Sequence, residues 1–107
     1  MKNLLLAFLM MTLALPAWAD KSATAALNDL RAGKSRKALA YSQKLEKIAQ
    51  GHLDDMVRNG FFDHKGSDGS TLGKRLKRAG YSYCFAAENI AWGQRDLAAV
   101  MREWEKS

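Results

Sequence analysis

Three residues of this sequence could do chemistry: the histidines His52 and His64, and Glu88, a carboxylate in an otherwise apolar segment. His64 follows two phenylalanines and an aspartate and precedes a turn with two glycines, and functional residues commonly lie on such loops. An ionised carboxylate at position 88 is costly to bury unless a cation, a metal or several N–H groups pair with it. We therefore expect His64 and Glu88 to meet in one cleft.

His64 and Glu88 are also candidate metal ligands. Imidazole nitrogen and carboxylate oxygen can both bind a divalent cation, so the pair could share one. A zinc site needs at least three protein ligands, and no complete metal motif is visible in residues 1–107. The alternative is structural: Glu88 accepts backbone hydrogen bonds and ties loops together. We assign no catalytic residue.

Two further residues are expected to support this cleft. His52 lies in the apolar stripe of a predicted helix, where a lone histidine is usually a core residue with its hydrogen bonds satisfied. We expect it to bond to the loop that follows, holding the His64 segment in place, while Phe61 and Phe62 pack that loop onto the same helix. Asn89 places an amide next to Glu88.

The elements that position these residues follow from periodicity and capping signals. Apolar spacing of three and four predicts an amphipathic helix that Ser42 caps and residues 59–60 end. Shorter helices are expected from Ser22 or Thr24 to about residue 32, from Ser70 or Thr71 to Gly80, and from Asp96 onward. Alternation predicts a strand at about residues 87–91. A single strand cannot satisfy its own backbone groups, so we expect the rest of its sheet beyond Ser107.

The N-terminus has the pattern of a signal peptide. Lys2 precedes an apolar run, and residues 17–19 form an A-x-A cleavage site. The run is short for a membrane span of about 20 residues, so we expect residues 1–19 to be removed near Ala19 rather than to anchor the chain. Residues 20–107 then form one domain of a secreted or periplasmic protein. Its lone cysteine, Cys84, is expected to be buried and inert or to pair outside this segment.

The formal net charge of +6 favours association with anionic surfaces such as lipid headgroups or cell-wall polymers. Export and the lack of a recognisable motif argue against nucleic acid as a partner. The only local basic cluster is expected to be a solvated helix face; it comprises Lys74, Arg75, Lys77 and Arg78.

Taken together, the motifs resemble the CAP superfamily, also called SCP domains, and most closely its short exported bacterial branch. The resemblance covers nearly all of residues 25–107. The matching residues are Leu45, Ala49, His52, Asp55-Met56, Phe61-Phe62-Asp63-His64, Ser67-Asp68-Gly69-Ser70, Arg75-Leu76, Ala79-Gly80-Tyr81, Glu88-Asn89-Ile90-Ala91, Val100, Trp104 and Ser107.

This resemblance implies an α+β fold, the N-terminal part of a CAP-type α-β-α sandwich in which helices pack on an incomplete antiparallel sheet. It also implies a cleft of two histidines and two acids, sometimes around zinc. His64 matches the first cleft histidine and Glu88 the first acid, with Ala87 where glycine is common. The second acid would fall at Ser107, and the second histidine beyond it.

Three functions are compatible with this pattern. The leading expectation is an exported binding module whose His/Glu cleft holds a divalent metal, a small apolar ligand or a cell-envelope component. The first alternative is a metal-assisted, peptidase-like hydrolase, in which His64 and Glu88 support a bound water. The second is an inactive, truncated remnant, because only about half of the family cleft is present.

Overall fold

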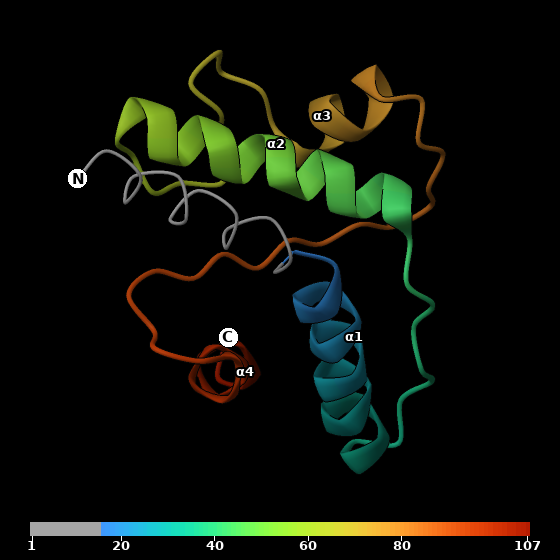
Figure 1. The fold of residues 1–107 in the computed structure, drawn as a ribbon. Helices are drawn as coiled ribbons and strands as arrows, with labels where there is room; N and C mark the ends of the chain where they lie inside the picture. Colours follow the sequence, from blue (N-terminus) through green and yellow to red (C-terminus); the bar gives the residue numbers. More distant parts are fainter. Residues whose placement is uncertain (1–15) are drawn as a thin grey trace, which may run out of the picture. The chain divides into compact units, whose positions relative to one another are not determined.

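The computed structural model describes the backbone of residues 16–107 and the side chains of residues 22–107, and it contains four helices. They are α1 (Pro16–Gly33), α2 (Gln43–Asn59), α3 (Leu72–Arg78) and α4 (Leu97–Glu105), shown in Figure 1. The chain divides into two compact units between Tyr41 and Ser42. Most of the predicted signal peptide, residues 1–15, lies outside the described residues. None of the described helices is both long and apolar enough to cross a membrane.

The first unit contains α1 and the loop that follows it. The helix begins at Pro16 rather than at Ser22 or Thr24, which corrects the predicted start. Proline suits a first helical position because its fixed φ matches the helix and its missing N–H would be unpaired there. The helix ends at Gly33, as predicted. Asn28 then holds the loop, since its side chain exchanges two hydrogen bonds with the backbone of Leu39.

In the second unit, α2 has the predicted ends. The Ser42 hydroxyl accepts a hydrogen bond from the N–H of Leu45. Gly60 adopts the left-handed conformation, with φ of 65°, and its N–H bonds to the carbonyl of Met56. Glycine is favoured at that position because it has no Cβ to clash. The helix buries His52 and Met56, which fall on its predicted apolar stripe.

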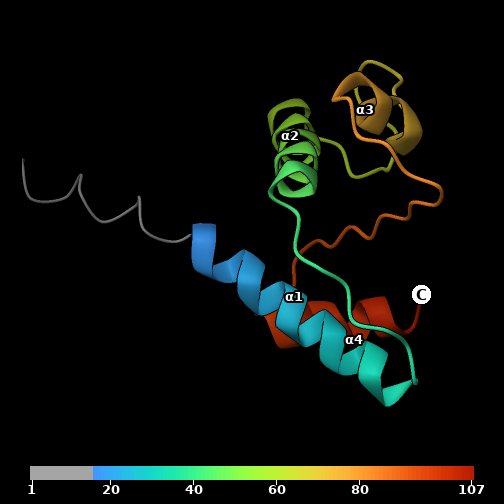
Figure 2. The same ribbon diagram turned by 90° about the vertical axis from the view of Figure 1, so that its right-hand side faces the viewer.

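The short helix α3 lies beside α2, as Figures 1 and 2 show. Thr71 caps it by accepting a hydrogen bond from the N–H of Lys74, and Gly80 follows its end with φ of 71°. Leu76 is its buried residue. A hydrogen bond of 3.1 Å from Lys44 Nζ to the carbonyl of Gly80 connects the start of α2 to the end of α3.

The predicted strand at residues 87–91 does not form, and no strand occurs within residues 16–107. A strand is defined by backbone bonds to a neighbour, and no described segment pairs with this one. The predicted alternation is visible in burial only as far as residue 90. Ala86, Glu88 and Ile90 are partly buried and Ala87 and Asn89 are exposed, but Ala91 is partly buried and Trp92 is exposed. The described structure is therefore helical, and the sheet of the expected α+β sandwich is not seen in it.

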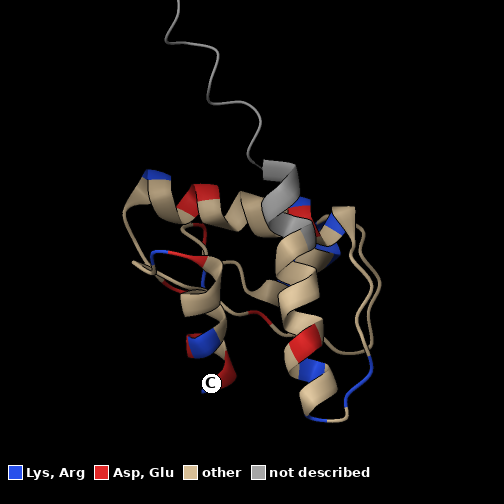
Figure 3. Ribbon diagram, turned by 60° about the horizontal axis from the view of Figure 1, so that its bottom comes forward, with Lys and Arg blue, Asp and Glu red and all other residues tan. Residues whose placement is uncertain are grey.

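The last helix, α4, begins as predicted after Asp96, whose carboxylate accepts a 2.8 Å hydrogen bond from the N–H of Ala99. Met101 is buried, and the indole N–H of Trp104 donates to the carbonyl of Ile90 at 3.2 Å. This bond ties α4 to the segment that carries Glu88. Figure 3 shows acidic and basic positions close together on α4 beside the C-terminus. The charged residues of α3, by contrast, are all basic.

Candidate functional site

The structure brings His64 and Glu88 together, as the sequence predicted. The Nδ1 atom of His64, on the loop between α2 and α3, lies 2.9 Å from Oε1 of Glu88. Because a carboxylate only accepts hydrogen bonds, Nδ1 carries the hydrogen. The His64 side chain is 58% exposed and that of Glu88 only 13%. The imidazole is therefore the solvent-exposed partner of this contact, and the carboxylate is the largely buried one.

Arg75, which sequence reasoning placed on a solvated face, is the third member of this cluster. Its NH1 and NH2 atoms donate to the two carboxylate oxygens of Glu88 at 2.8 and 3.2 Å. NH2 also donates to the carbonyl of His64 at 2.6 Å. The Arg75 side chain is 9% exposed, so the predicted solvated cluster is wrong at this position. A signal was present, because Arg75 lies three residues after Leu72 and four before Ala79, on the inward stripe of the helix.

Glu88 is charged in this setting. Burial by itself raises the pKa of its carboxyl group, but hydrogen bonds from Arg75 and His64 and the charge of Arg75 outweigh that effect. The net result is a pKa below the usual range. The site thus has a partly buried carboxylate neutralised by a guanidinium, with an exposed imidazole at its edge.

His52 supports the site loop in the way the sequence predicted. It is 3% exposed, and its Nε2 lies 2.7 Å from the carbonyl oxygen of Asp63. Its ring also meets that of Phe61 edge-on, with centroids 6.2 Å apart. Asp63 directly precedes His64, whose own carbonyl accepts from Arg75. The loop is therefore held from α2 on one side and from α3 on the other.

The second phenylalanine of the loop, Phe62, has an aromatic partner that the sequence analysis did not identify. Its ring meets that of Trp92 edge-on, with centroids 6.0 Å apart. Both rings remain open to solvent, 48% and 68% exposed. The loop carrying Phe62 and His64 therefore contacts the segment carrying Glu88 and Trp92 twice, once by a hydrogen bond and once by an aromatic pair. We call this junction the seam.

The turn after His64 is held by two aspartates. Asp55 of α2 accepts hydrogen bonds from the N–H and the hydroxyl of Ser67, and these bonds lower the pKa of Asp55. Asp68 accepts from the N–H of Ser70 at 2.9 Å. Gly66 is needed here because a Cβ at that position would lie 2.6 Å from the Ser70 hydroxyl.

Asn89 and Cys84 lie apart from the cluster. Asn89 is exposed, and its side-chain oxygen lies 3.4 Å from the hydroxyl of Ser107. It contacts neither His64 nor Arg75 in any hydrogen bond of the described structure. Cys84 is exposed, so the expectation of a buried, inert thiol is wrong, and pairing outside residues 22–107 remains the other interpretation.

The described residues do not fit a zinc site. Both oxygens of Glu88 accept from Arg75, so a positive charge already occupies the position that a cation would take. Within the described part of the chain, no three His, Cys, Asp or Glu side chains gather closely enough to hold a metal. His64 and Glu88 supply two donors where at least three are required.

Comparisons with known proteins identify the family to which this chain is similar. Residues 24–107 match the family described as "CAP: Cysteine-rich secretory protein family". The chain is 31% identical over 88 residues to the uncharacterized protein YkwD of Bacillus subtilis, a match that covers 82% of this chain and 34% of that protein. It is 30% identical over 80 residues to the uncharacterized membrane protein YlbC of the same organism, covering 75% of this chain and 23% of that protein.

The matched region thus spans only about a third and a quarter of these two relatives. No solved structure gives a significant match.

Proposed function

We propose that this chain, which belongs to the CAP family of cysteine-rich secretory proteins, is an exported binding module that holds a cell-envelope component at the seam. The match over residues 24–107 shows that the chain belongs to this family. The observation that supports the binding role is the pairing of a polar cluster with an exposed aromatic pair between the same two segments.

The two halves of the seam would recognise different parts of a ligand. Phe62 and Trp92 offer exposed ring surface, and burying apolar surface of this kind contributes about 25 cal/mol per Å². His64 offers its exposed ring edge, since Nδ1 is committed to Glu88 and no described residue bonds its Nε2. A ligand with an apolar or ring face and an adjacent hydrogen-bonding group fits this arrangement, and envelope glycans and amphipathic lipids both have that character.

We infer that Arg75 preorganises the site for binding. Its guanidinium spans Glu88 and the His64 carbonyl, so the imidazole is fixed both through its side chain and through its backbone. Preorganisation of this kind lowers the entropy cost of binding. The metal-assisted hydrolase is less well supported, because the carboxylate it needs as a ligand is already paired with this cation.

Co-sedimentation with purified peptidoglycan sacculi and with phosphatidylglycerol vesicles tests the proposal. We expect the protein to sediment with one of the two preparations, and Phe62→Ser and His64→Ala each to weaken that binding severalfold. Val57→Ser is the matched control, because Val57 is an exposed apolar residue of α2 that lies outside the seam. The proposal fails if neither preparation retains the protein, or if Phe62→Ser and Val57→Ser bind alike.

A further inference from the structure

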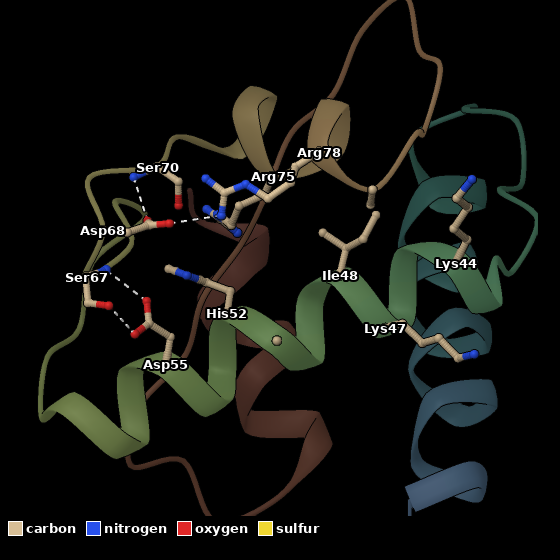
Figure 4. Close-up of a pocket in the computed structure, with 12 residues that line it drawn as sticks. Lys44, Lys47, Ile48, His52, Asp55, Ser67, Asp68, Ser70, Arg75 and Arg78 are labelled. Carbon is tan, nitrogen blue, oxygen red and sulfur yellow. Dashed lines mark hydrogen bonds and ion pairs between the residues drawn. The ribbon is translucent and has the colours of Figure 1, made fainter.

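A second candidate site lies apart from the seam. A cavity of about 650 Å³ opens between α2, α3 and the loop of residues 66–70, and Figure 4 shows the side chains that line it. One stripe of α2 forms its long wall, with residues spaced three and four apart as one helix face requires. These residues are Lys44, Lys47, Ile48, Gly51, His52 and Asp55.

One end of this cavity is basic, and the other contains two carboxylates. Lys44 and Lys47 lie at the first end (Figure 4). Asp55 and Asp68 lie at the second, where Arg78 pairs with Asp68, and His52 lies between the two ends. At a rise of about 1.5 Å per residue, the eight positions from Lys47 to Asp55 correspond to roughly 12 Å along α2. Hydrogen bonds from Ser67 lower the pKa of Asp55, and those from Ser70 lower the pKa of Asp68, so both carboxyl groups are ionised at neutral pH.

Two of the residues that line the cavity, His52 and Arg75, each have a buried polar atom without a partner. His52 Nδ1 and Arg75 Nε are both buried and make no hydrogen bond in the described structure, although leaving buried polar groups unpaired is costly. Because His52 Nε2 contacts a carbonyl oxygen, which only accepts, Nε2 carries the hydrogen and Nδ1 is an acceptor. Arg75 Nε–H is a donor. The wall therefore lacks one donor and one acceptor.

We propose that this cavity binds a short, extended peptide with both termini free. The peptide ammonium group would lie at Asp55 and Asp68, and its carboxylate at Lys44 and Lys47. Each peptide unit has one N–H and one C=O, which complement His52 Nδ1 and Arg75 Nε. An extended chain spans about 3.3–3.6 Å per residue, so three to four residues reach from one charged end to the other.

The acidic end of the cavity already contains one exposed ion pair. Arg78 reaches from α3 to Asp68, with NH1 2.9 Å from Oδ2, and both side chains are largely exposed, at 64% and 50%. Exposed pairs of this kind contribute little to stability. A peptide ammonium group can therefore replace Arg78 at Asp68. This inference does not rest on the function proposed for the seam, since it requires neither Phe62 nor the His64 imidazole.

Titration of the purified, isotope-labelled protein with trialanine, followed by NMR, tests the proposal. We expect saturable shifts of the His52 ring nitrogens and of the Asp55 and Ser67 amides, with no comparable change at His64. N-acetylated and C-amidated trialanine should each bind about three- to tenfold more weakly, because each loses one charged end. Raising the salt concentration should weaken the free peptide most, since these charges are partly exposed.

A lysine substitution tests whether the peptide carboxylate binds at the basic end of the cavity. Lys47→Gln should weaken free trialanine about threefold or more, yet leave C-amidated trialanine unaffected, because the amide has no carboxylate for Lys47 to contact. Lys106→Gln is the matched control. Lys106 is an exposed lysine at the C-terminal end of α4, and it does not line the cavity. The proposal is overturned if no saturable shift occurs up to about 10 mM, if blocking the termini changes nothing, or if the shifts centre on His64.

Discussion

Arg75 and Glu88 form a two-pronged ion pair between α3 and the segment before α4, with nitrogen–oxygen distances of 2.8 and 3.2 Å. Parallel N–H donors on a planar guanidinium match the two oxygens of a carboxylate, and this adds geometric specificity to the attraction. The same helix contains Arg78, which makes a single contact with an exposed aspartate. The two arginines therefore provide an internal comparison of a shielded and an exposed ion pair.

The shielded pair should be the more important for stability. Arg75→Gln removes the cation from a carboxylate that is only 13% exposed, and we expect the free energy of unfolding to fall by about 2–3 kcal/mol. Arg78→Gln should cause little measurable change, because its pair is solvated. Urea denaturation followed by circular dichroism measures both. Equal losses in the two variants would show that Arg75 has no special structural role.

Glu88 should make the protein sensitive to acid. Its pKa is lowered in the folded state because hydrogen bonds from Arg75 and His64 outweigh the effect of burial. A lowered folded pKa adds stability above the unfolded value of about 4.3 and loses it as the pH falls through the folded pKa.

Unfolding free energies measured from pH 7 to pH 3 should therefore fall more steeply for the wild type than for Glu88→Gln. Asp55 and Asp68, whose pKa values are also lowered, contribute to both curves and cancel in the difference. Parallel curves for the two proteins would contradict the prediction.

The two histidines should differ in how much they contribute to the free energy of unfolding. His52→Leu leaves the carbonyl of Asp63 without its partner and removes a buried polar ring, so we expect a loss of about 1–3 kcal/mol in unfolding free energy. His64→Leu should cost about 1 kcal/mol or less, since its side chain is 58% exposed. Thermal and chemical denaturation of the two variants in parallel checks this. A larger loss at His64 would reverse the assignment of supporting and binding roles.

Zinc should bind this chain weakly. Because Arg75 occupies both oxygens of Glu88, we expect calorimetric titration of the purified protein to show no saturable binding in the micromolar range. Stoichiometric binding that both His64→Ala and Glu88→Gln abolish would show instead that the metal displaces the guanidinium. In that case His64 and Glu88 would be metal ligands, as the sequence analysis expected.

Local patterns in the sequence determined most of the helical scaffold. The cap at Ser42, the left-handed Gly60 and the cap at Asp96 all follow from short-range rules about which side chains satisfy the ends of helices. The pairing of His64 with Glu88 could also be predicted, because a carboxylate in an apolar segment requires a partner. The start of α1 at Pro16 was missed, since the preceding residues were interpreted as an export signal.

Only the tertiary structure decided what completes the site. The sequence predicted a solvated face of the helix for Arg75. The tertiary structure instead brings Glu88 and the carbonyl of His64 to its guanidinium, and these partners offset the cost of burying the charge. In the same way, only the tertiary structure pairs the Phe62 ring with that of Trp92, which lies 30 positions further along the chain. The strand at residues 87–91 failed for the complementary reason. A strand depends on backbone bonds to a neighbour that no local pattern supplies, whereas the capped ends of a helix lie within a few residues of one another.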